Sequence, residues 1–541
     1  MELFIKIAMI VVFFVATLYI GFYCRKKASN SNDFLLGGRN VGPWLSAFAY
    51  GTSYFSAVIF IGYAGSFGWK FGVAAFWIGI GNAVIGSLLP WLILGRRTRL
   101  ITQKMNSSTM PDFFGKRFNS KGLKTFAAII VAVFLVPYTA ALYNGLSSLF
   151  ATAFGFNQYA IWILIISVIT AIYVIIGGLM SSAINSFVQG IIMLIGISLV
   201  VFFALEKNGG LMGTMEKLSL HGWEFTSMFG SDPMHLLFVI ILTSLGTWGL
   251  PQMVSKFYSI SNESHIKKGT IISTLFALVV AGGCYFLGGL GRLFADPMIS
   301  GSYQGSSSDI IPNMVTNLLS NNILNAFLVG LVVLLVLAAS MSTLSSLVMT
   351  SASTVSVDLL GHKKDEKKNM WTLRILILIF IVVSALLAIF QIYGPESLRN
   401  DIASLMGISW GAISGAFIGP FVYGLYWKKT TKASVWTSFI LGILIAVFSL
   451  VCKYMGLANN LGFLGVFLSD SIYMGVVAMI TSLIIVPVVS LFTKNSQEDN
   501  QKTEDLFSCY NTLVTVPASD VLTDTNIANE NTTLKNIENE E

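Results

Sequence analysis

The sequence predicts an all-α protein that crosses a lipid bilayer many times, and three observations lead to this prediction. First, 55% of the 541 residues are hydrophobic and 11% are charged, whereas soluble globular proteins carry about 25% charged residues. Second, apolar stretches of about 20 residues, the length of a membrane-crossing helix, recur along most of the chain. Third, Lys and Arg are concentrated in alternate connections between these stretches.

Thirteen stretches, called spans 1 to 13 below, have the length and composition of a membrane-crossing helix. In order they are residues 4–23, 43–67, 71–95, 124–150, 157–178, 182–205, 234–258, 268–293, 322–357, 372–393, 401–427, 433–455 and 471–493. We expect span 1 to be a true span, because its basic residues follow the apolar run and no small-residue cleavage site is evident. Span 9 is too long for one crossing and is expected to leave the membrane near Val357.

The distribution of basic residues predicts the orientation. With the N-terminus outside and the C-terminus inside, 24 Lys and Arg fall in inner connections, Lys256 among them, and seven fall in outer ones. No Lys or Arg is expected in the middle of a span. The net charge of +7 is therefore explained by topology, and no nucleic-acid partner is expected. We expect a multi-pass protein of the plasma (inner) membrane.

Residues 1–493 are predicted to form one transmembrane domain, followed by a tail. Residues 494–541 carry ten acidic and three basic side chains and are expected to be a disordered, acidic cytoplasmic tail. The sequence has no phosphate-binding loop and no other catalytic motif, so we expect neither ATP as an energy source nor an enzyme. No cofactor and no obligatory protein partner are evident.

Acidic side chains are missing from the middle of every span. Proton-driven carriers usually hold a carboxylate or a histidine within the bilayer, because some group must take up the proton. Neutral oxygens of hydroxyls and unwound backbone remain available for a monovalent cation. Sodium coupling is therefore favoured, and a proton-coupled carrier or a transporter-like solute sensor stay as alternatives.

Span 9 is rich in hydroxyl groups. Ten Ser and Thr lie between Ser340 and Ser356. Ala339, Ser342 and Thr343 have the spacing i, i+3, i+4, which places a carbonyl and two hydroxyls on one helix face. Two interpretations fit this spacing: an ion site, or small residues that allow close helix packing.

Spans 2 and 7 are both interrupted by small and polar residues. Residues 49–56 of span 2 combine Gly51 with hydroxyls, and residues 243–251 of span 7 contain two glycines and Pro251. Each interruption opens a block of five spans, so the second block lies inverted relative to the first. Paired broken helices in two inverted repeats, about 43–206 and 234–428, indicate the binding site of a transporter. Two independent kinks are the alternative.

Five motifs resemble the sodium:solute symporter family, whose members carry proline, pantothenate, sialic acid, monocarboxylates, iodide or glucose. They are Phe34-Leu35-Leu36-Gly37-Gly38-Arg39, Thr109-Met110-Pro111-Asp112-Phe113-Phe114, Tyr173-Val174-Ile175-Ile176-Gly177-Gly178-Leu179, Val188-Gln189 and Met341-Ser342-Thr343-Leu344-Ser345. The resemblance covers most of residues 15–455, with the proline and pantothenate branches nearest. It implies the leucine-transporter-type fold of two inverted five-helix repeats, with one extra helix before and two after, thirteen in all.

The resemblance also implies a sodium site between spans 2 and 9. Carried over position by position, its ligands are the carbonyls of Thr52, Phe55 and Ala339 and the hydroxyls of Ser342 and Thr343. In sialic acid carriers an Asp in span 6 helps to hold a second sodium with hydroxyls that match Ser345 and Ser346. This chain has Ser186 in place of that Asp, so we expect the second site to be absent and one sodium to move per cycle.

Two further departures concern the solute. Proline carriers have an acid where this chain has Tyr54, and their aromatic contacts in span 7 become Thr243 and Thr247, which puts proline itself in doubt. Twelve candidate solute-contacting residues share a polar or aromatic side chain facing the expected cavity: Ser53, Tyr54, Ser56, Trp77, Asn82, Tyr138, Tyr143, Thr243, Thr247, Trp248, Ser404 and Trp410. Plain helix packing explains any one of the aromatic residues as well.

Together these observations predict a secondary active transporter. It is expected to carry sodium and a small organic solute, such as an amino acid, a monocarboxylate or a pantothenate-like compound, by alternating access. The sequence does not name the solute.

Overall fold

The structure, a computed structural model, describes residues 2–24, 31–294, 310–316, 322–361, 365–395, 402–456 and 461–511. These residues are mostly helical and form no strand; two of them, Val41 and Ile260, pair in an isolated parallel bridge. Ten helices within the described ranges are long and apolar enough to cross a membrane, or 11 if the bent pair Pro233–Gly249 and Pro251–Tyr258 counts as one span. The chain is thus an all-α, multi-pass membrane protein.

The first half of the chain supplies spans 1 to 6. Its helices are α1 (Glu2–Cys24), α2 (Ser31–Leu36), η2 (Gly37–Arg39), α3 (Pro43–Tyr54), η3 (Val58–Tyr63), α4 (Ala64–Phe71), η4 (Gly72–Ala75), α5 (Phe76–Ala83), η5 (Val84–Leu88), η6 (Trp91–Gly95), α6 (Arg96–Lys104), α7 (Met110–Arg117), α8 (Lys121–Phe154), α9 (Tyr159–Lys207) and α10 (Gly210–Ser219).

The second half supplies spans 7 to 13. Its helices are η7 (Trp223–Phe225), α11 (Pro233–Leu245), η8 (Gly246–Gly249), α12 (Pro251–Tyr258), α13 (Ser264–Gly289), η9 (Gly291–Leu293), α14 (Ile310–Thr316), α15 (Asn322–Ser353), η11 (Thr354–Leu359), α16 (Glu366–Tyr393), α17 (Ile402–Tyr426), α18 (Lys432–Tyr454), α20 (Gly462–Ser469), α21 (Ser471–Phe492), α22 (Gln497–Phe507) and η13 (Ser508–Asn511).

Two long helical runs each combine parts of two predicted spans. Residues Val58–Lys104 continue from span 2 through span 3, and α9 contains spans 5 and 6. Within α9 the backbone is broken at Gly178, where φ is 58° and ψ is −158°. A side chain there would also meet the Phe34 ring of α2 at 2.8 Å, so glycine satisfies both the left-handed backbone and the close packing. The total of thirteen membrane helices stays a prediction.

Both predicted interruptions are present as breaks in the backbone. After α3, Phe55 is extended, with φ −99° and ψ 122°, before the chain resumes as helix at Val58. After η8, Leu250 is extended, with φ −86° and ψ 120°, and Pro251 begins α12. The segments on either side of this second break are bent by 45°. Helix ends free backbone groups at both positions.

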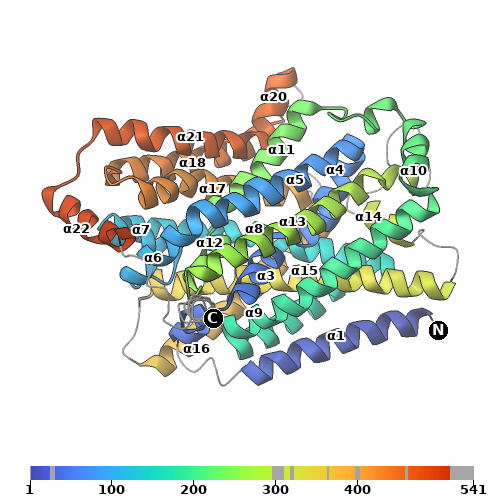
Figure 1. The fold of residues 1–541 in the computed structure, drawn as a ribbon, viewed down its shortest axis with the longest axis horizontal. Helices are drawn as coiled ribbons and strands as arrows, with labels where there is room; N and C mark the ends of the chain where they lie inside the picture. Colours follow the sequence, from blue (N-terminus) through green and yellow to red (C-terminus); the bar gives the residue numbers. More distant parts are fainter. Residues whose placement is uncertain are drawn as a thin grey trace, which may run out of the picture.

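The interior of the protein is built around α15 and α17. In the apolar window of α15 and η11, 89% of residues are buried, and in α17 94% are, whereas only 17% are in α1 at the edge of the bundle (Figure 1). Helix α15 packs against α1, α3, α8, α9, α12 and α16. The hydroxyl-rich segment of span 9 therefore lies in the centre of the protein rather than against lipid.

The predicted inner elements gather at one end of the bundle. In Figure 1 α6, α7 and α22 lie at the left, and α10 and the N-terminus lie at the right, as alternating spans require. The basic residues Arg25, Lys26, Lys27, Lys363 and Lys364, which contributed to the predicted orientation, lie outside the described residues. The direction in which the bundle crosses the membrane stays a prediction.

The beginning of the tail differs from the disorder expected for residues 494–541. Residues 497–511 form α22 and η13, which dock on the predicted inner end of the bundle. Asp499 pairs with Lys432 at 2.8 Å, and Asp505 pairs with Lys104 at 2.8 Å. Arg117 donates to the Thr503 hydroxyl at 3.0 Å. Acidic residues of the tail thus meet basic residues of the predicted inner connections, and residues 512–541 lie outside the described residues.

Candidate functional site

Hydroxyl groups of α3, α9 and α15 meet beside the break that follows α3. Ser342 Oγ lies 2.7 Å from Thr52 Oγ1 and 2.7 Å from Ser186 Oγ, so one serine of α15 joins the other two helices. All three side chains are almost wholly buried. One helical turn further along α15, Ser346 Oγ lies 2.8 Å from Ser53 Oγ. We call Thr52, Ser53, Ser186, Ser342 and Ser346 the hydroxyl cluster.

Four of the five predicted sodium ligands are close together. The Thr343 hydroxyl donates toward the carbonyls of Thr52, at 3.3 Å, and Ala339, at 3.1 Å. Ser342 touches the side chain of Thr52. The fifth ligand, the Phe55 carbonyl, belongs to the extended residue directly after α3. Neutral carbonyl and hydroxyl oxygens from two helices are the donor set that suits a dehydrated monovalent cation.

Helix α15 also bonds to the backbone that follows the break. Ser340 Oγ accepts a hydrogen bond of 2.8 Å from the backbone N–H of Ala57, the residue before η3. This bond satisfies a donor at the start of the resumed helix, which would otherwise lack a partner in the interior. Span 9 therefore fixes the irregular backbone of span 2 as well as contributing oxygens to the site.

Ser345, one of the serines at the second sodium position that we expect to be absent, bonds to other oxygens of α9 and α15. Ser345 Oγ donates to the Ser342 carbonyl at 2.8 Å and lies 2.7 Å from Ser182 Oγ of α9. Tyr173 of α9 donates to the carbonyl of Met341. Within the described part of the chain, no group of three or more His, Cys, Asp or Glu side chains is placed to hold a metal ion.

Lys256 is not in a surface connection, where the sequence analysis placed it. It lies on α12 with 5% of its surface exposed, two residues before the helix ends, and its Nζ donates to Ser346 Oγ at 2.7 Å. The apolar stretch of span 7 ends close to Lys256. The sequence alone therefore does not distinguish a residue at the end of a buried helix from one in the connection that follows. The hydroxyl cluster therefore has a lysine ammonium at its edge.

A second polar group lies across the break, between α3, α5 and α11. The Tyr54 hydroxyl is 2.6 Å from the Thr243 carbonyl and 3.0 Å from Asn82 Oδ1, so one hydrogen serves two acceptors. Ser244, which the sequence analysis did not select, donates to the same Asn82 oxygen at 3.0 Å. Gly86 allows Tyr54 to approach, because a Cβ at Gly86 would lie 2.1 Å from the tyrosine oxygen.

Aromatic side chains close this group on the side of α8 and α17. The Trp410 ring lies 6.2 Å from the Tyr54 ring and 5.8 Å, edge on, from the Tyr138 ring. Four buried polar atoms here make no hydrogen bond of good geometry with the described residues, although Ser56 and Trp410 lie beside the Tyr138 hydroxyl: Ser56 Oγ, Asn82 Nδ2, Tyr138 OH and Trp410 Nε1. Buried polar atoms without partners are unfavourable in a finished interior, so this group is the best candidate for contact with a solute.

The other predicted solute contacts lie elsewhere. Trp77 is 37% exposed and its indole donates to the Met228 carbonyl at the surface, away from the group around Tyr54. Ser404 accepts from Lys453 at 3.5 Å. Thr247 and Trp248 donate to the carbonyls of Gly86 and Ile85, at 3.2 and 2.8 Å, which fastens η8 to η5.

Tyr143 of α8 does not join Tyr138, although both are buried. Five residues along an α-helix turn a side chain by about 140° around the axis, so the two tyrosines point in different directions. Ser53, also predicted to contact solute, belongs to the hydroxyl cluster through its bond to Ser346. The twelve candidates therefore fall into three sets. One is the compact group around Tyr54, one fastens η8 to η5, and the remaining residues lie away from both.

Known transporters are similar to this chain along most of its length. Residues 34–442 match the family model described as the sodium:solute symporter family. An osmoregulated proline transporter of Bacillus subtilis is 27% identical over 490 residues, covering 89% of this chain and 94% of the relative. A sodium/proline symporter of Staphylococcus aureus (strain JH9) is 28% identical over 505 residues, covering 90% and 92%.

Solved structures share the fold. A substrate-bound, outward-open Na+-coupled sialic acid symporter superposes with a TM-score of 0.69 at 17% identity, covering 91% of this chain and 99% of that one. A nucleobase-cation-symport-1 family transporter in a closed conformation gives a TM-score of 0.50 at 15% identity, covering 87% and 98%. Both are symporters, and both likenesses concern the arrangement of helices alone.

Proposed function

Since the chain belongs to the sodium:solute symporter family, we propose that it moves one sodium ion and one small organic solute together across the plasma membrane by alternating access. Membership makes the protein a sodium-coupled transporter and not an enzyme. The observation that carries the finer proposal is the pair of polar groups on the two sides of the α3 break: neutral oxygens toward α15, and polar and aromatic side chains toward α5, α11 and α17.

The proposed sodium ligands are the five oxygens predicted from the sequence. They are the carbonyls of Thr52, Phe55 and Ala339 and the hydroxyls of Ser342 and Thr343. In the structure Thr343 donates toward two of these carbonyls, and a bound ion would accept lone pairs from all of them once the hydroxyl hydrogens turn away. Because the ligands come from both α3 and α15, the ion would hold these helices together.

The proposed solute lies between Tyr54, Asn82, Tyr138 and Trp410. No Lys, Arg, Asp or Glu takes part in the hydrogen bonds or ring contacts recorded for these four residues in the described parts of the chain. A site of this kind suits a small solute without net charge, such as a zwitterionic amino acid, which can offer both donors and acceptors to the unpartnered atoms.

Proline is one candidate, because relatives of this chain at 27% and 28% identity are proline transporters. Its neutral zwitterion matches the lack of charged side chains in the solute site. The presence of Tyr54, Thr243 and Thr247 where proline carriers have other residues leaves room for a different solute of the same size. The family's anionic solutes, such as monocarboxylates and pantothenate, would depend on backbone N–H groups at the broken helices.

In the proposed cycle, external sodium binds first and stabilises the state that is open to the outside. Sodium between α3 and α15 positions the break, and the adjacent Tyr54 then completes the solute site. Both then leave toward the inside. Moving one charge through about 100 mV supplies roughly 2.3 kcal/mol, to which the sodium concentration gradient adds.

The proposal is tested by uptake into proteoliposomes that contain the purified protein. A panel of radiolabelled proline, other amino acids, monocarboxylates, sialic acid and pantothenate is offered with an inward sodium gradient, and then with choline in place of sodium. We expect one class of neutral solute to accumulate in sodium only. Accumulation that is unchanged in choline, or that follows an imposed proton gradient instead, would overturn sodium coupling.

A further inference from the structure

The ammonium of Lys256 lies one helical turn from the proposed sodium ligands. Its Nζ donates to Ser346 Oγ at 2.7 Å, and Ser346 is four residues from Ser342 on α15. The side chain is 5% exposed and forms no salt bridge with any acid in the described ranges. A buried cation without a counter-charge needs compensation from oxygen dipoles, which the serines beside it provide.

The hydroxyl groups in and next to the hydroxyl cluster carry no formal charge. Ser346 meets Ser53 at 2.8 Å, Ser345 meets Ser182 at 2.7 Å, and Ser342 meets Ser186 at 2.7 Å. These bonds connect α12, through Lys256, with α3, α9 and α15. Among the described residues that form these bonds and the bond to Ser346, Lys256 is the one charged residue.

An ammonium group and a sodium ion are stabilised by the same kind of partner. Both carry one positive charge and both are stabilised by oxygen lone pairs, the ammonium by donating hydrogens and sodium by direct coordination. Two such charges a few ångström apart in a poorly solvated interior repel each other strongly. A second sodium on Ser345 and Ser346 would therefore compete with the ammonium that is already there.

A small cavity next to Lys256 has room for water. It has a volume of about 40 Å³ and is lined by Lys256, Ser346, Ser182, Pro251 and Ser255, among others. This is room for a few water molecules, because each needs roughly 10–15 Å³ of such volume. The remaining two hydrogens of the ammonium can thus be satisfied by water without a carboxylate.

We propose that Lys256 is a built-in cation that occupies the second-ion position of this symporter. The lysine stays with the protein through the cycle, so the position is filled without a second sodium and only the first sodium is transported. This inference rests on the proposed function and explains its stoichiometry by a residue that is present, rather than only by the acid that Ser186 replaces.

Counting bound sodium on the purified, detergent-solubilised protein tests the proposal without knowledge of the solute. Equilibrium binding of ²²Na⁺ should give one ion per wild-type chain. Lys256→Ala with Ser186→Asp removes the built-in cation and adds a carboxylate, and this double variant should bind two ions, with a Hill coefficient above one. Ser186→Asp alone should still bind one, because the ammonium then neutralises the new carboxylate.

The outcomes separate the two proposals. No sodium binding by the wild type would sink the proposed function, whereas two ions on the wild type, or two on Ser186→Asp alone, would overturn the role of Lys256 only. One ion on a folded double variant up to molar sodium would do the same. Lys256→Arg, which keeps the charge, should bind one ion; if the double variant does not fold, the wild-type and Ser186→Asp counts still decide.

Discussion

Ser342 has an unusual position for a single hydroxyl, because it contacts two other helices at once. Its oxygen lies 2.7 Å from the side chains of both Thr52 and Ser186. One hydroxyl has one hydrogen, so at least one of these neighbours must donate to it. The Ser342 oxygen thus has several polar neighbours and no charged one among these contacts. Such an oxygen can give up a hydrogen bond and bind a monovalent ion instead.

Removal of a proposed ligand should weaken sodium coupling. We expect Ser342→Ala and Thr343→Ala each to raise the sodium concentration for half-maximal uptake roughly tenfold or more, because a hydrogen bond or ligand to a charge contributes about 1.5–3 kcal/mol. Sodium-dependent uptake into proteoliposomes measures the change.

Two control variants accompany this measurement. Thr343→Ser keeps the hydroxyl and should stay close to the wild type. Ser351→Ala removes another buried hydroxyl of α15 that has no hydrogen-bond partner among the described residues, and should also have little effect. If both alanine variants at the proposed site behave like Ser351→Ala, the sodium ligands lie elsewhere.

At the level of whole elements, α4 and α13 approach more closely than side chains allow. A Cβ on Gly288 would lie 2.0 Å from the Ala64 carbonyl oxygen, and one on Gly68 would lie 2.1 Å from the carbonyl carbon of Gly288. The contact is therefore backbone against backbone. It places the segment after the α3 break directly against α13.

A methyl group at this contact should separate the two helices. We expect Gly288→Ala to destabilise the protein by about 1–3 kcal/mol through overpacking, since the obstacle is a backbone oxygen that cannot turn aside. The apparent melting temperature of the purified protein should fall by several degrees. Gly42→Ala is the matched control, because a Cβ at Gly42 meets nothing within 4 Å. Equal melting temperatures for the two variants would contradict this packing.

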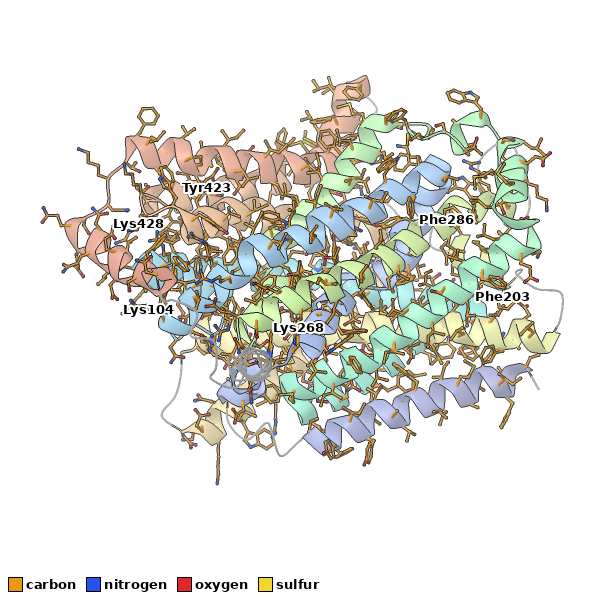
Figure 2. All side chains as sticks on the ribbon, viewed as in Figure 1. Lys104, Phe203, Lys268, Phe286, Tyr423 and Lys428 are labelled. Atoms are coloured by element: carbon orange, nitrogen blue, oxygen red, sulfur yellow. The ribbon has the colours of Figure 1, made fainter. Side chains whose placement is uncertain are left out.

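The docking of α22 depends on ion pairs at the predicted inner end of the bundle, where Figure 2 labels Lys104 and Lys428. Lys428 pairs with Glu504, and Lys104 with Asp505. Partial burial raises the pKa of Asp499, but hydrogen bonds from Lys432, Ser496 and Asn119 outweigh it and lower this pKa to about 2. Exposed pairs of this kind are screened by salt.

Salt should therefore loosen α22, and physiological changes of pH should not. The contribution of Asp499 is complete above its unfolded pKa of about 3.9 and is lost only as the pH falls toward 2, so docking should be constant between pH 5 and 8. Hydrogen-exchange protection of α22 amides should decrease from 0.1 M to 1 M KCl (roughly a Debye length of 10 to 3 Å).

A pair of lysine variants identifies the contact responsible. Lys432→Ala should lower the protection of α22 by roughly two- to fivefold, in line with a surface pair of about 0.5–1 kcal/mol. Lys502→Ala removes a pair with Glu498 that lies within α22 itself, and should leave docking unchanged. Protection that changes steeply between pH 5 and 8 would argue against this account.

For the whole molecule, a bound sodium ion should stabilise the fold, because its proposed ligands come from helices far apart in the sequence. Ligand at one hundred times its dissociation constant adds roughly 2.7 kcal/mol to stability when it binds only the folded state. The melting temperature should therefore rise in NaCl relative to KCl of equal strength, and Ser342→Ala should reduce this rise. An equal response to both salts in the wild type would count against the site.

The sequence predicted best those features that depend on local backbone conformation. Gly51 with hydroxyls in span 2, and Gly249 with Pro251 in span 7, predicted the two breaks, because missing side chains and a missing N–H act locally. Spacing on a helix face also placed Ala339, Ser342 and Thr343 together. Both properties are determined within a few residues.

Contacts between elements far apart in the sequence were harder to predict. Whether Trp77 faces the interior or the surface depends on the rotation of α5, and hydrophobicity around the helix does not specify it. Lys256 near a helix end resembles any basic residue of an inner connection, and its contact with Ser346 depends on how α12 crosses α15. The docking of α22 arises from complementary charges that lie far apart along the chain, 401 residues for Lys104 and Asp505.

The bridge between Val41 and Ile260 has a consequence for how such a protein can diverge. Val41 precedes the first broken helix and Ile260 follows the second. Val41 donates its N–H to the Ser259 carbonyl at 3.1 Å, and its own carbonyl accepts from the Ser261 N–H at 3.3 Å, on either side of Ile260. Arg39 reinforces the junction by donating to the Tyr258 carbonyl. Because main-chain atoms form this junction, it does not depend on which side chains occupy the proposed solute site, so transporters with different cargo can share it.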